Sequence, residues 1–298
     1  DYSIPYSGEP LIKLPNTLEH VGVFGSEIVK FDSGNGEILK NRLYKVGTSG
    51  IYAIDNQIYY LSGYFILKLN PVDLSYAKFN LPPHINSIYS SYPVTKHPLA
   101  DDKLILYTNT DTPDYSRVTI SSFNLISHDI EPLFQLPSNF HIYGKSAAMG
   151  SKIYFLASES IDSQIRMVLF SYDTESEIYH EEYSLNIEFQ SNTGDIFFLS
   201  GLVAGENQKL YGAGSVVPGD SQYHIFSYDP TTGIFNVLGA FSEETGGGII
   251  GNLSYRDGHI YGNTSAGGEQ NLGCVFAYQL ADNQFDLLYT YDSLNSFE

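Results

Sequence analysis

The sequence has 298 residues, of which 42% are hydrophobic and 16% are charged, with 34 acidic against 15 basic residues and a formal net charge of −19. A chain of this size and apolar content can bury a large core, as one all-β domain or as two average domains. The charge argues against nucleic acid and anionic lipid as partners, because both are bound largely through clustered Lys and Arg.

Short apolar strands recur along the chain, and the first recurring element is an apolar pair in a strand that we name b. Asp, Asn, Gly or Lys precedes most copies, which is typical of a strand that follows a tight turn. The successive spacings of 46, 49, 57 and 50 residues indicate a tandem repeat. The pairs are Ile58-Tyr59, Leu104-Ile105, Ile153-Tyr154, Leu210-Tyr211 and Ile260-Tyr261.

A second recurring element is an alternating strand, named c, that usually ends in Asp or Asn. A short polar turn follows each copy, and an apolar residue five or six positions later begins a strand d. Six copies of strand c predict six modules. They are Ile28–Asp32, Ile66–Asn70, Ile120–Asn124, Leu169–Asp173, Ile225–Asp229 and Val275–Gln279.

Each module also needs a strand b and a preceding strand a. For the first module we assign strand b to Leu11–Leu14, because the distance from there to strand c matches two later modules. Its strand a is then Tyr2–Tyr6, which forms either the innermost strand of the first blade or a clasp on the last blade. The strand a of the third module falls within Ser87–Val94. The other strands a are Gly50–Ile54, Phe140–Met149, Phe197–Gly205 and Gly248–Tyr255.

Four strands in each repeat and no helical periodicity predict an all-β fold, a β-propeller of six four-stranded blades. Stacked blades bury both faces of each sheet, which one sheet could not do alone. A seventh blade would need more residues than the first 45 supply. We expect a single propeller domain over residues 1–298, with blades at about 1–46, 47–86, 87–138, 139–190, 191–242 and 243–298.

The last module carries Ile260–Gly268 (IYGNTSAGG), Asn271–Tyr278 (NLGCVFAY) and Phe285–Tyr291 (FDLLYTY). This pattern resembles the GloVer tandem repeat of secreted or surface-anchored bacterial proteins. The strands with DGHIY and YDPTTG are also similar to kelch repeats, although the Gly-Gly doublet after strand b and the Trp after the c–d turn are missing. The resemblance covers residues 206–292; it implies a propeller and a secreted or cell-surface location, and it carries no catalytic residues.

Location and redox chemistry have few other signals. No apolar run approaches the roughly 20 residues that span a bilayer, so we expect no membrane insertion. The chain begins at Asp1 rather than Met, which we interpret as a processed start. The only cysteine, Cys274, lies in an apolar run and is expected to be a buried, small hydrophobic side chain.

Ligands of propellers are expected at the channel mouth or on rim loops, which are free of the packing constraint. The loops between strands b and c are the longest; two of them hold pairs of carboxylates that could bind Ca²⁺ through oxygen, and otherwise no cofactor is expected. Loop tyrosines could stack on a sugar. The candidate ligand-binding residues are Tyr107, Asp111, Asp114, Tyr115, Glu159, Asp162, Asp220 and Tyr223.

Two functions fit the sequence. The first is a secreted or surface-exposed, monomeric binding module for a carbohydrate or protein ligand, and it follows from the repeat and from the lack of local catalytic motifs such as HExxH and GxSxG. The alternative is an enzyme, a hydrolase or lyase, whose acid and base groups converge from several blades at the channel mouth. We assign no catalytic residues.

Overall fold

The computed structural model describes residues 12–14, 19–24, 27–32, 38–43, 49–54, 57–88, 95–110, 118–137, 140–161, 164–187, 200–216, 222–247 and 249–291. Within these ranges all regular elements are β-strands, and neighbouring strands pair in antiparallel fashion. The predicted all-β class is therefore confirmed. The described part of the chain contains no helix with the length and apolar character needed to cross a membrane.

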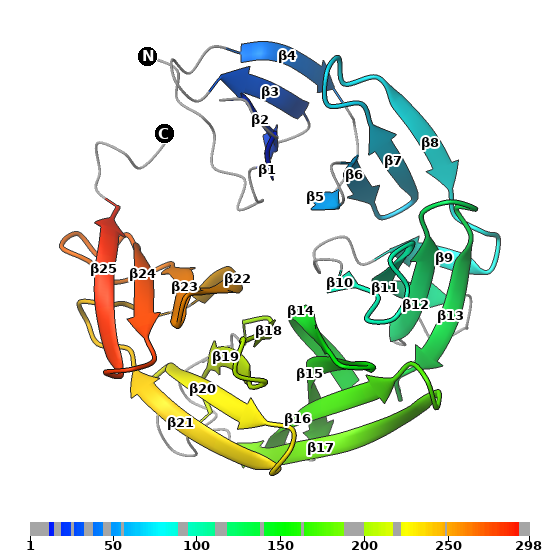
Figure 1. The fold of residues 1–298 in the computed structure, drawn as a ribbon. Helices are drawn as coiled ribbons and strands as arrows, with labels where there is room; N and C mark the ends of the chain where they lie inside the picture. The colour runs from blue at the N-terminus through cyan, green and yellow to red at the C-terminus, as the bar shows by residue number, and fades with distance from the viewer. Residues whose placement is uncertain are drawn as a thin grey trace. The chain divides into compact units, whose positions relative to one another are not determined.

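The described residues divide into two compact units. Unit 1 is drawn from Asp1–Val94 and Leu104–Gln135, and unit 2 from Thr95–Lys103 and Leu136–Ser296. Unit 1 contains three sheets, each with its strands in chain order (Figure 1). They comprise β1 (Ile12–Lys13), β2 (Glu19–Phe24), β3 (Glu27–Asp32) and β4 (Ile38–Leu43); β5 (Ser49–Ile54), β6 (Gln57–Ser62), β7 (Phe65–Leu69) and β8 (Tyr76–Asn80); and β9 (Ile85–Ile88), β11 (Lys103–Thr110), β12 (Val118–Asn124) and β13 (Ile130–Gln135).

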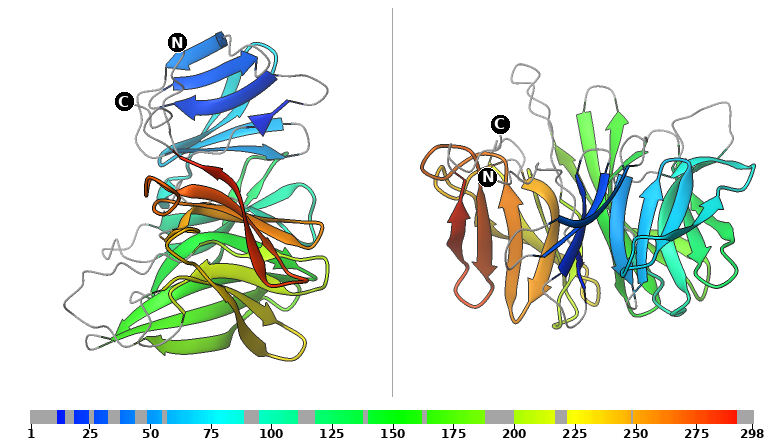
Figure 2. Two further views of the ribbon diagram at one scale, coloured as in Figure 1. Left: turned by 90° about the vertical axis from the view of Figure 1, so that its left-hand side faces the viewer. Right: turned by 90° about the horizontal axis from the view of Figure 1, so that it is seen from above.

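Unit 2 contains the short strand β10 (Thr95–Lys96) and three four-stranded sheets in which strand order again follows chain order. Figure 2 shows the last of these sheets, in orange and red, as strands that run up and down beside one another. The sheets comprise β14 (Phe140–Met149), β15 (Lys152–Ile161), β16 (Gln164–Asp173) and β17 (Ile178–Ile187); β18 (Val203–Ala204), β19 (Leu210–Gly214), β20 (His224–Asp229) and β21 (Ile234–Ala240); and β22 (Ile249–Arg256), β23 (His259–Thr264), β24 (Cys274–Gln279) and β25 (Gln284–Thr290).

The first module is shifted by one strand from the prediction. Strand c is β3, as expected, but its neighbour is β2, with Glu19 opposite Asp32 and Phe24 opposite Glu27. The short strand β1, within Leu11–Leu14, pairs with β2 and is therefore strand a, not strand b. The assignment was wrong because the spacing to strand c was used in place of pairing, and β2 begins only five residues after Leu14. The segment Tyr2–Tyr6 lies outside the described residues.

The residue that ends strand c has a structural role in the c–d turn. The Asp229 carboxylate accepts hydrogen bonds from the backbone N–H groups of Thr231 and Thr232, at 2.9 and 3.3 Å, and Asp173 and Asn124 accept equivalent pairs. A short polar side chain that binds the backbone two or three residues ahead closes a tight turn locally. This explains why Asp or Asn recurs at the end of strand c.

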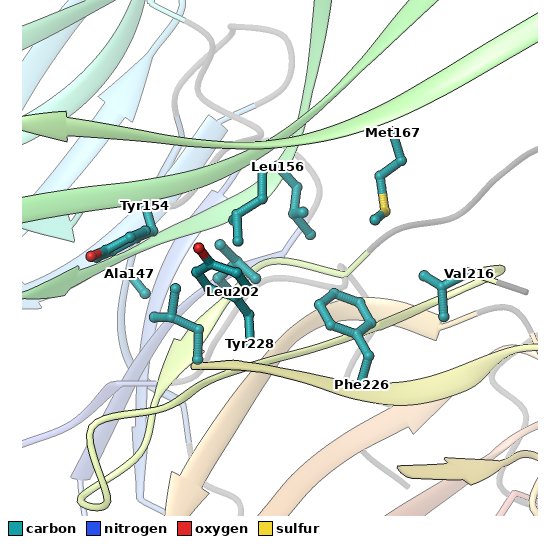
Figure 3. Packing of buried hydrophobic residues seen from close by; sticks show 10 residues of the cluster. Ala147, Tyr154, Leu156, Met167, Leu202, Val216, Phe226 and Tyr228 are labelled. Atoms are coloured by element: carbon teal, nitrogen blue, oxygen red, sulfur yellow. The ribbon is translucent and has the colours of Figure 1, made fainter. Parts of the chain in front are cut away.

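Neighbouring sheets pack face to face through the side chains of strands b and c. Figure 3 shows this packing in unit 2, where Leu156 and Met167 of one sheet meet Phe226 and Tyr228 of the next. Phe226 is fully buried, and burial of one such aromatic side chain contributes about 1.5–3 kcal/mol. Strands d, in contrast, expose apolar side chains such as Ile178, Ile234 and Leu288.

The first strands of the sheets in unit 2 lie close to one another: β14, β18 and β22 are in mutual contact (Figure 1). Pairing along β14 is interrupted by an irregularity between Tyr143 and Ala147. There the carbonyl of Lys145 accepts a hydrogen bond from the Leu202 N–H at 2.7 Å, and the Ser146 carbonyl accepts one from Thr95 Oγ1 at 2.8 Å. The irregular backbone thus binds segments of its two neighbours.

Candidate ligand-binding cleft

A cleft of about 620 Å³ lies in unit 2 at the ends of the sheets β18–β21 and β22–β25. This volume falls within the range of about 300–1,000 Å³ that is usual for small-molecule sites. Three segments form its walls: the residues before β20, the loop from β21 to β22, and the loop from β23 to β24. The lining residues are Gln222, Tyr223, Phe241, Ser242, Glu243, Gly246, Gly247, Ala266, Gly267, Gly268 and Asn271.

One wall is the turn in the loop from β21 to β22, and its own side chains close it. The Ser242 N–H donates to Thr245 Oγ1 at 2.6 Å, and the Thr245 N–H donates back to Ser242 Oγ at 3.2 Å. The Gly246 N–H donates to the Ser242 carbonyl at 2.7 Å. These reciprocal bonds fix the turn that presents Glu243 to the cleft.

Another wall is the glycine-rich loop between β23 and β24, and backbone hydrogen bonds join it to the turn after β21. Gly247 and Ala266 exchange N–H donors and carbonyl acceptors at 3.3 and 3.2 Å, and the Gly268 N–H donates to the Glu244 carbonyl at 3.0 Å. Asn271 Oδ1 accepts the Gly267 N–H at 2.8 Å. Since both walls are tied together in this way, the cleft is formed before a ligand arrives.

Glycine is required where the walls meet. Gly246 has φ of +89°, in the region that side chains disfavour, and an added Cβ would overlap the carbonyl oxygen of Ala266. The backbones of the two walls can touch at this point because Gly246 has no side chain.

Tyr223 provides the aromatic surface of the cleft. Its side chain is half-buried, and its carbonyl accepts the Phe241 N–H at 2.8 Å, which anchors it at the start of β20. Gly247 faces the ring: a Cβ at this position would lie 3.6 Å from Cδ2 and 3.8 Å from Cε2 of Tyr223. Because Gly247 has no side chain, it adds no side-chain atoms over this part of the ring.

The single cysteine is bonded to the turn that forms one wall of the cleft. Cys274 is fully buried, its Sγ donates to the Thr245 carbonyl at 3.1 Å, and its N–H donates to Thr264 Oγ1 at 3.1 Å. Burial raises the pKa of the Cys274 thiol, while the hydrogen bond with Thr264 opposes the shift. A buried thiol with a raised pKa is a poor nucleophile, so the expected structural role of Cys274 is confirmed.

Among the predicted ligand-binding residues, Tyr223 lines the cleft. Tyr107 was expected at the surface, which is wrong: it lies in β11 and is 1% exposed, since its strand is covered on both faces. The Glu159 carboxylate binds the Arg166 guanidinium at 2.7 Å, and Glu181 binds the same group at 2.8 Å. Asp111, Asp114, Tyr115, Asp162 and Asp220 lie outside the described residues.

Several lining residues were not selected from the sequence. The turn with Glu243 and Gly246 carries no recognised motif, and the loop with Gly267, Gly268 and Asn271 belongs to the segment that resembles the repeat family. The signal that would have found them is topological. The loops b–c and d–a emerge at the same end of antiparallel four-stranded sheets, so consecutive sheets bring them together.

A second polar cluster, the Glu182 cluster, lies where the sheets β14–β17 and β18–β21 meet. The Glu182 carboxylate accepts hydrogen bonds from Lys152 Nζ at 2.9 Å, Ser171 Oγ at 2.6 Å and the Tyr228 hydroxyl at 3.2 Å. Burial acts to raise the pKa of Glu182, but the bonds from Ser171 and Lys152 outweigh it and hold the pKa below its ordinary value. Burial and the nearby Glu182 charge raise the pKa of Tyr154 to about 12. Through the bond from Tyr228 to Glu182, this cluster links the two sheets.

Metal ligands do not gather in the part of the chain that the structure describes: it contains no group of three or more His, Cys, Asp or Glu side chains placed to hold an ion. A smaller hollow of about 520 Å³ lies in unit 1 beside the turn from β7 to β8. It is smaller than the cleft in unit 2, which is therefore the stronger candidate for a ligand site.

No family model and no curated protein matches the sequence. Among solved structures, an oligogalacturonate lyase in complex with manganese is similar over 97% of this chain and 78% of its own, with 12% identity and a TM-score of 0.64. An oligogalacturonate lyase from Vibrio parahaemolyticus has 10% identity, a TM-score of 0.61, and coverage of 98% and 78%. An extracellular domain from B. thetaiotaomicron has 16% identity, a TM-score of 0.57, and coverage of 97% and 34%.

At these identities the similarity shows the fold alone. The structural neighbours are β-propeller proteins, so the chain has a β-propeller fold, as predicted. The number of blades and the resemblance to the GloVer and kelch repeats stay predictions.

Proposed function

We propose that this protein is a secreted or surface-exposed β-propeller that binds a glycan in the cleft of unit 2 and does not transform it. The observation that carries the proposal is the half-buried Tyr223, which lines the cleft together with Gln222, Glu243 and Asn271. Sugars present apolar C–H faces and a rim of hydroxyls, and a binding site for them needs both kinds of surface.

The form of the cleft supports a small ligand rather than a protein. A protein interface of standard size buries about 800 Å² on each partner and is usually flat, whereas this cleft is a concave space of about 620 Å³ with walls fixed by hydrogen bonds. Fixed walls favour binding because little ordering entropy is lost when the ligand arrives.

The secreted or surface location and the repeat type are further parts of the proposal. The similarity to an extracellular domain from B. thetaiotaomicron is compatible with the location, as is the absence of clustered Lys and Arg in the sequence. The recurring strands b and c, with Asp or Asn at the c–d turn, support a GloVer-like or kelch-like repeat.

A lyase is the second candidate, because two oligogalacturonate lyases are among the similar structures. Elimination from a uronate requires a base and a cation that stabilises the developing negative charge. The lining residues that the structure describes include no Lys, Arg or His. We therefore favour binding without catalysis at this site.

The test is a binding screen of the purified protein against neutral and acidic oligosaccharides, with Kd values measured by calorimetry. Tyr223→Ala is expected to weaken the best ligand by about ten-fold or more, because it removes the stacking surface. Tyr64→Ala is the matched control: Tyr64 is 66% exposed, in unit 1, and its loss should leave Kd unchanged.

Equal binding by wild type and Tyr223→Ala would place the ligand elsewhere and overturn the assignment of the cleft. Release of an unsaturated product from an oligouronate, followed by ultraviolet absorbance, would instead establish the lyase.

A further inference from the structure

The cleft of unit 2 has an unusual charge. Among the described residues that line it, Glu243 carries the one carboxylate, and none is Lys, Arg or His. Glu243 is exposed on the turn after β21, so it faces solvent and any ligand that enters. The other described lining residues are neutral: two aromatic side chains, hydroxyl and amide side chains, an alanine and glycines.

This charge pattern separates two classes of sugar chain. A uronate carboxylate that entered the cleft would meet the like charge of Glu243 without a compensating cation, and a single like charge at contact distance weakens binding by roughly five-fold even with the screening of water. A neutral sugar suffers no such penalty, because its hydroxyls can donate hydrogen bonds to the same carboxylate.

The amide at the opposite wall is suited to the same class. Asn271 accepts the Gly267 N–H through Oδ1, and its Nδ2 carries two donor hydrogens that can bind a ligand. Sugar hydroxyls both donate and accept, and Glu243 with Asn271 supplies one acceptor and one donor. The backbone N–H groups of Gly267 and Gly268 are already bound to Asn271 and Glu244, so the glycine-rich loop does not offer them to an anion.

We infer that the cleft selects uncharged oligosaccharides and rejects chains of uronates. This inference rests on the proposed glycan-binding function and names its ligand class. It also separates this protein from the oligogalacturonate lyases that share its fold, whose substrate is a polyanion.

The experiment compares each neutral oligosaccharide with the same chain after its C6 alcohols are oxidised to carboxylates. The probes are β-1,4-gluco-oligosaccharides, β-1,4-galacto-oligosaccharides and α-1,4-gluco-oligosaccharides, each with its oxidised counterpart, in low and high salt. We expect at least five-fold weaker binding of the oxidised form of the best ligand, with a smaller difference at high salt, where charges are screened.

Glu243→Gln identifies the residue responsible. This variant should reduce the ratio of the two dissociation constants by about five-fold, whatever change it makes in the affinity for the neutral form. Glu244→Gln is the matched control, because Glu244 is the adjacent exposed carboxylate, does not line the cleft, and contacts the loop only through its backbone carbonyl.

The outcomes are distinct. Equal or tighter binding of the oxidised forms would overturn this inference while the proposed glycan-binding function stands. Binding of neither form of any probe would count against the proposed function itself. An unchanged difference in Glu243→Gln would show that this carboxylate is not the selective group.

Discussion

Unit 2 contains two junctions between neighbouring sheets, and they differ in the polar groups that lie beside them. At both junctions the apolar side chains of strands b and c fill the space between the sheets. The junction of β14–β17 with β18–β21 contains the Glu182 cluster, in which Lys152, Ser171 and Tyr228 surround one carboxylate. The junction of β18–β21 with β22–β25 contains the cleft.

The two features lie at opposite ends of their sheets. Tyr228 and Tyr278 are the penultimate residues of β20 and β24, next to the c–d turns, and lie opposite Phe235 and Phe285 in the adjacent strands d. The Tyr228 hydroxyl reaches Glu182 of the preceding sheet, whereas the Tyr278 hydroxyl binds Asn283 of its own turn. Polar side chains therefore link the first junction near the c–d turns. At the second junction, glycines let two loop backbones meet at the other end, where the b–c and d–a loops form the cleft.

The largest effect is expected at Gly246, where the two walls of the cleft touch. Gly246→Ala would force a side chain into a backbone with φ of +89° and against the Ala266 carbonyl, so we expect a loss of about 3 kcal/mol in the free energy of unfolding and loss of glycan binding. Urea denaturation measures the first and calorimetry the second.

Gly233→Ala is the control for conformational strain alone. Gly233 has φ of +69° in the turn before β21, but nothing lies within 4 Å of its missing Cβ. We expect a cost of about 1 kcal/mol and unchanged ligand affinity. If the two variants lose equal stability, the close contact of the cleft walls is not what makes Gly246 necessary.

The second largest effect is expected in the Glu182 cluster. Glu182→Gln removes the charge that Lys152 and two hydroxyls share at a carboxylate whose side chain is 15% exposed, so we expect a loss of about 2 kcal/mol in the free energy of unfolding. Glu181→Gln should cost less than about 1 kcal/mol, because Glu181 is 38% exposed in its pair with Arg166.

The same variant has an expected pH signature. The pKa of Glu182 is lower in the folded protein than in the unfolded chain, so its stabilisation is fully present above about pH 4.3 and is lost as the pH falls through the folded-state pKa. Wild type should therefore lose stability faster than Glu182→Gln on acidification below about pH 4.3. Parallel pH profiles of unfolding would contradict the role of the cluster.

The smallest effect on stability is expected at Gly247. An alanine here would make ordinary contact with the Tyr223 ring, at 3.6 Å, so the free energy of unfolding should change by less than about 0.5 kcal/mol. The methyl group would cover part of the ring and weaken glycan binding by about three- to ten-fold. Thermal denaturation and calorimetry together separate the two effects.

Gly63→Ala provides the comparison for Gly247→Ala. Gly63 is in unit 1, and its missing Cβ would lie no closer than 3.8 Å to another atom, the Ile88 carbonyl oxygen. This variant should leave both stability and binding unchanged. Unimpaired binding in Gly247→Ala would mean that the ligand does not contact this part of the ring.

Much of the fold could be predicted from the sequence, because strand periodicity and turn chemistry are local. The inner strands Phe140–Met149 and Gly50–Ile54 were found within one residue of β14 and β5. Each of the six segments predicted as strand c overlaps an observed strand, and at Asn124, Asp173 and Asp229 the final side chain closes the next turn. The first module was misassigned, since the irregular spacing of β1 and β2 hides which strands pair.

The site was predicted far less well. Tyr223 was selected because it lies beside a loop, and the same argument selected Tyr107, which is buried. Exposure of a tyrosine near a strand end depends on what the neighbouring sheet places over it. Glu243 and Asn271 were passed over because each is unremarkable in its own segment.

The sequence alone determined the all-β class, the strands and the turns, because strand periodicity and turn chemistry are local. Tertiary structure decided which distant segments meet at each junction. The hydrogen bonds of Gly247 with Ala266 and of Tyr228 with Glu182 join residues 19 and 46 positions apart, and no local pattern encodes them. The physical reason is that a cleft is a space between sheets, and its size depends on the side chains that two distant segments bring to the same place.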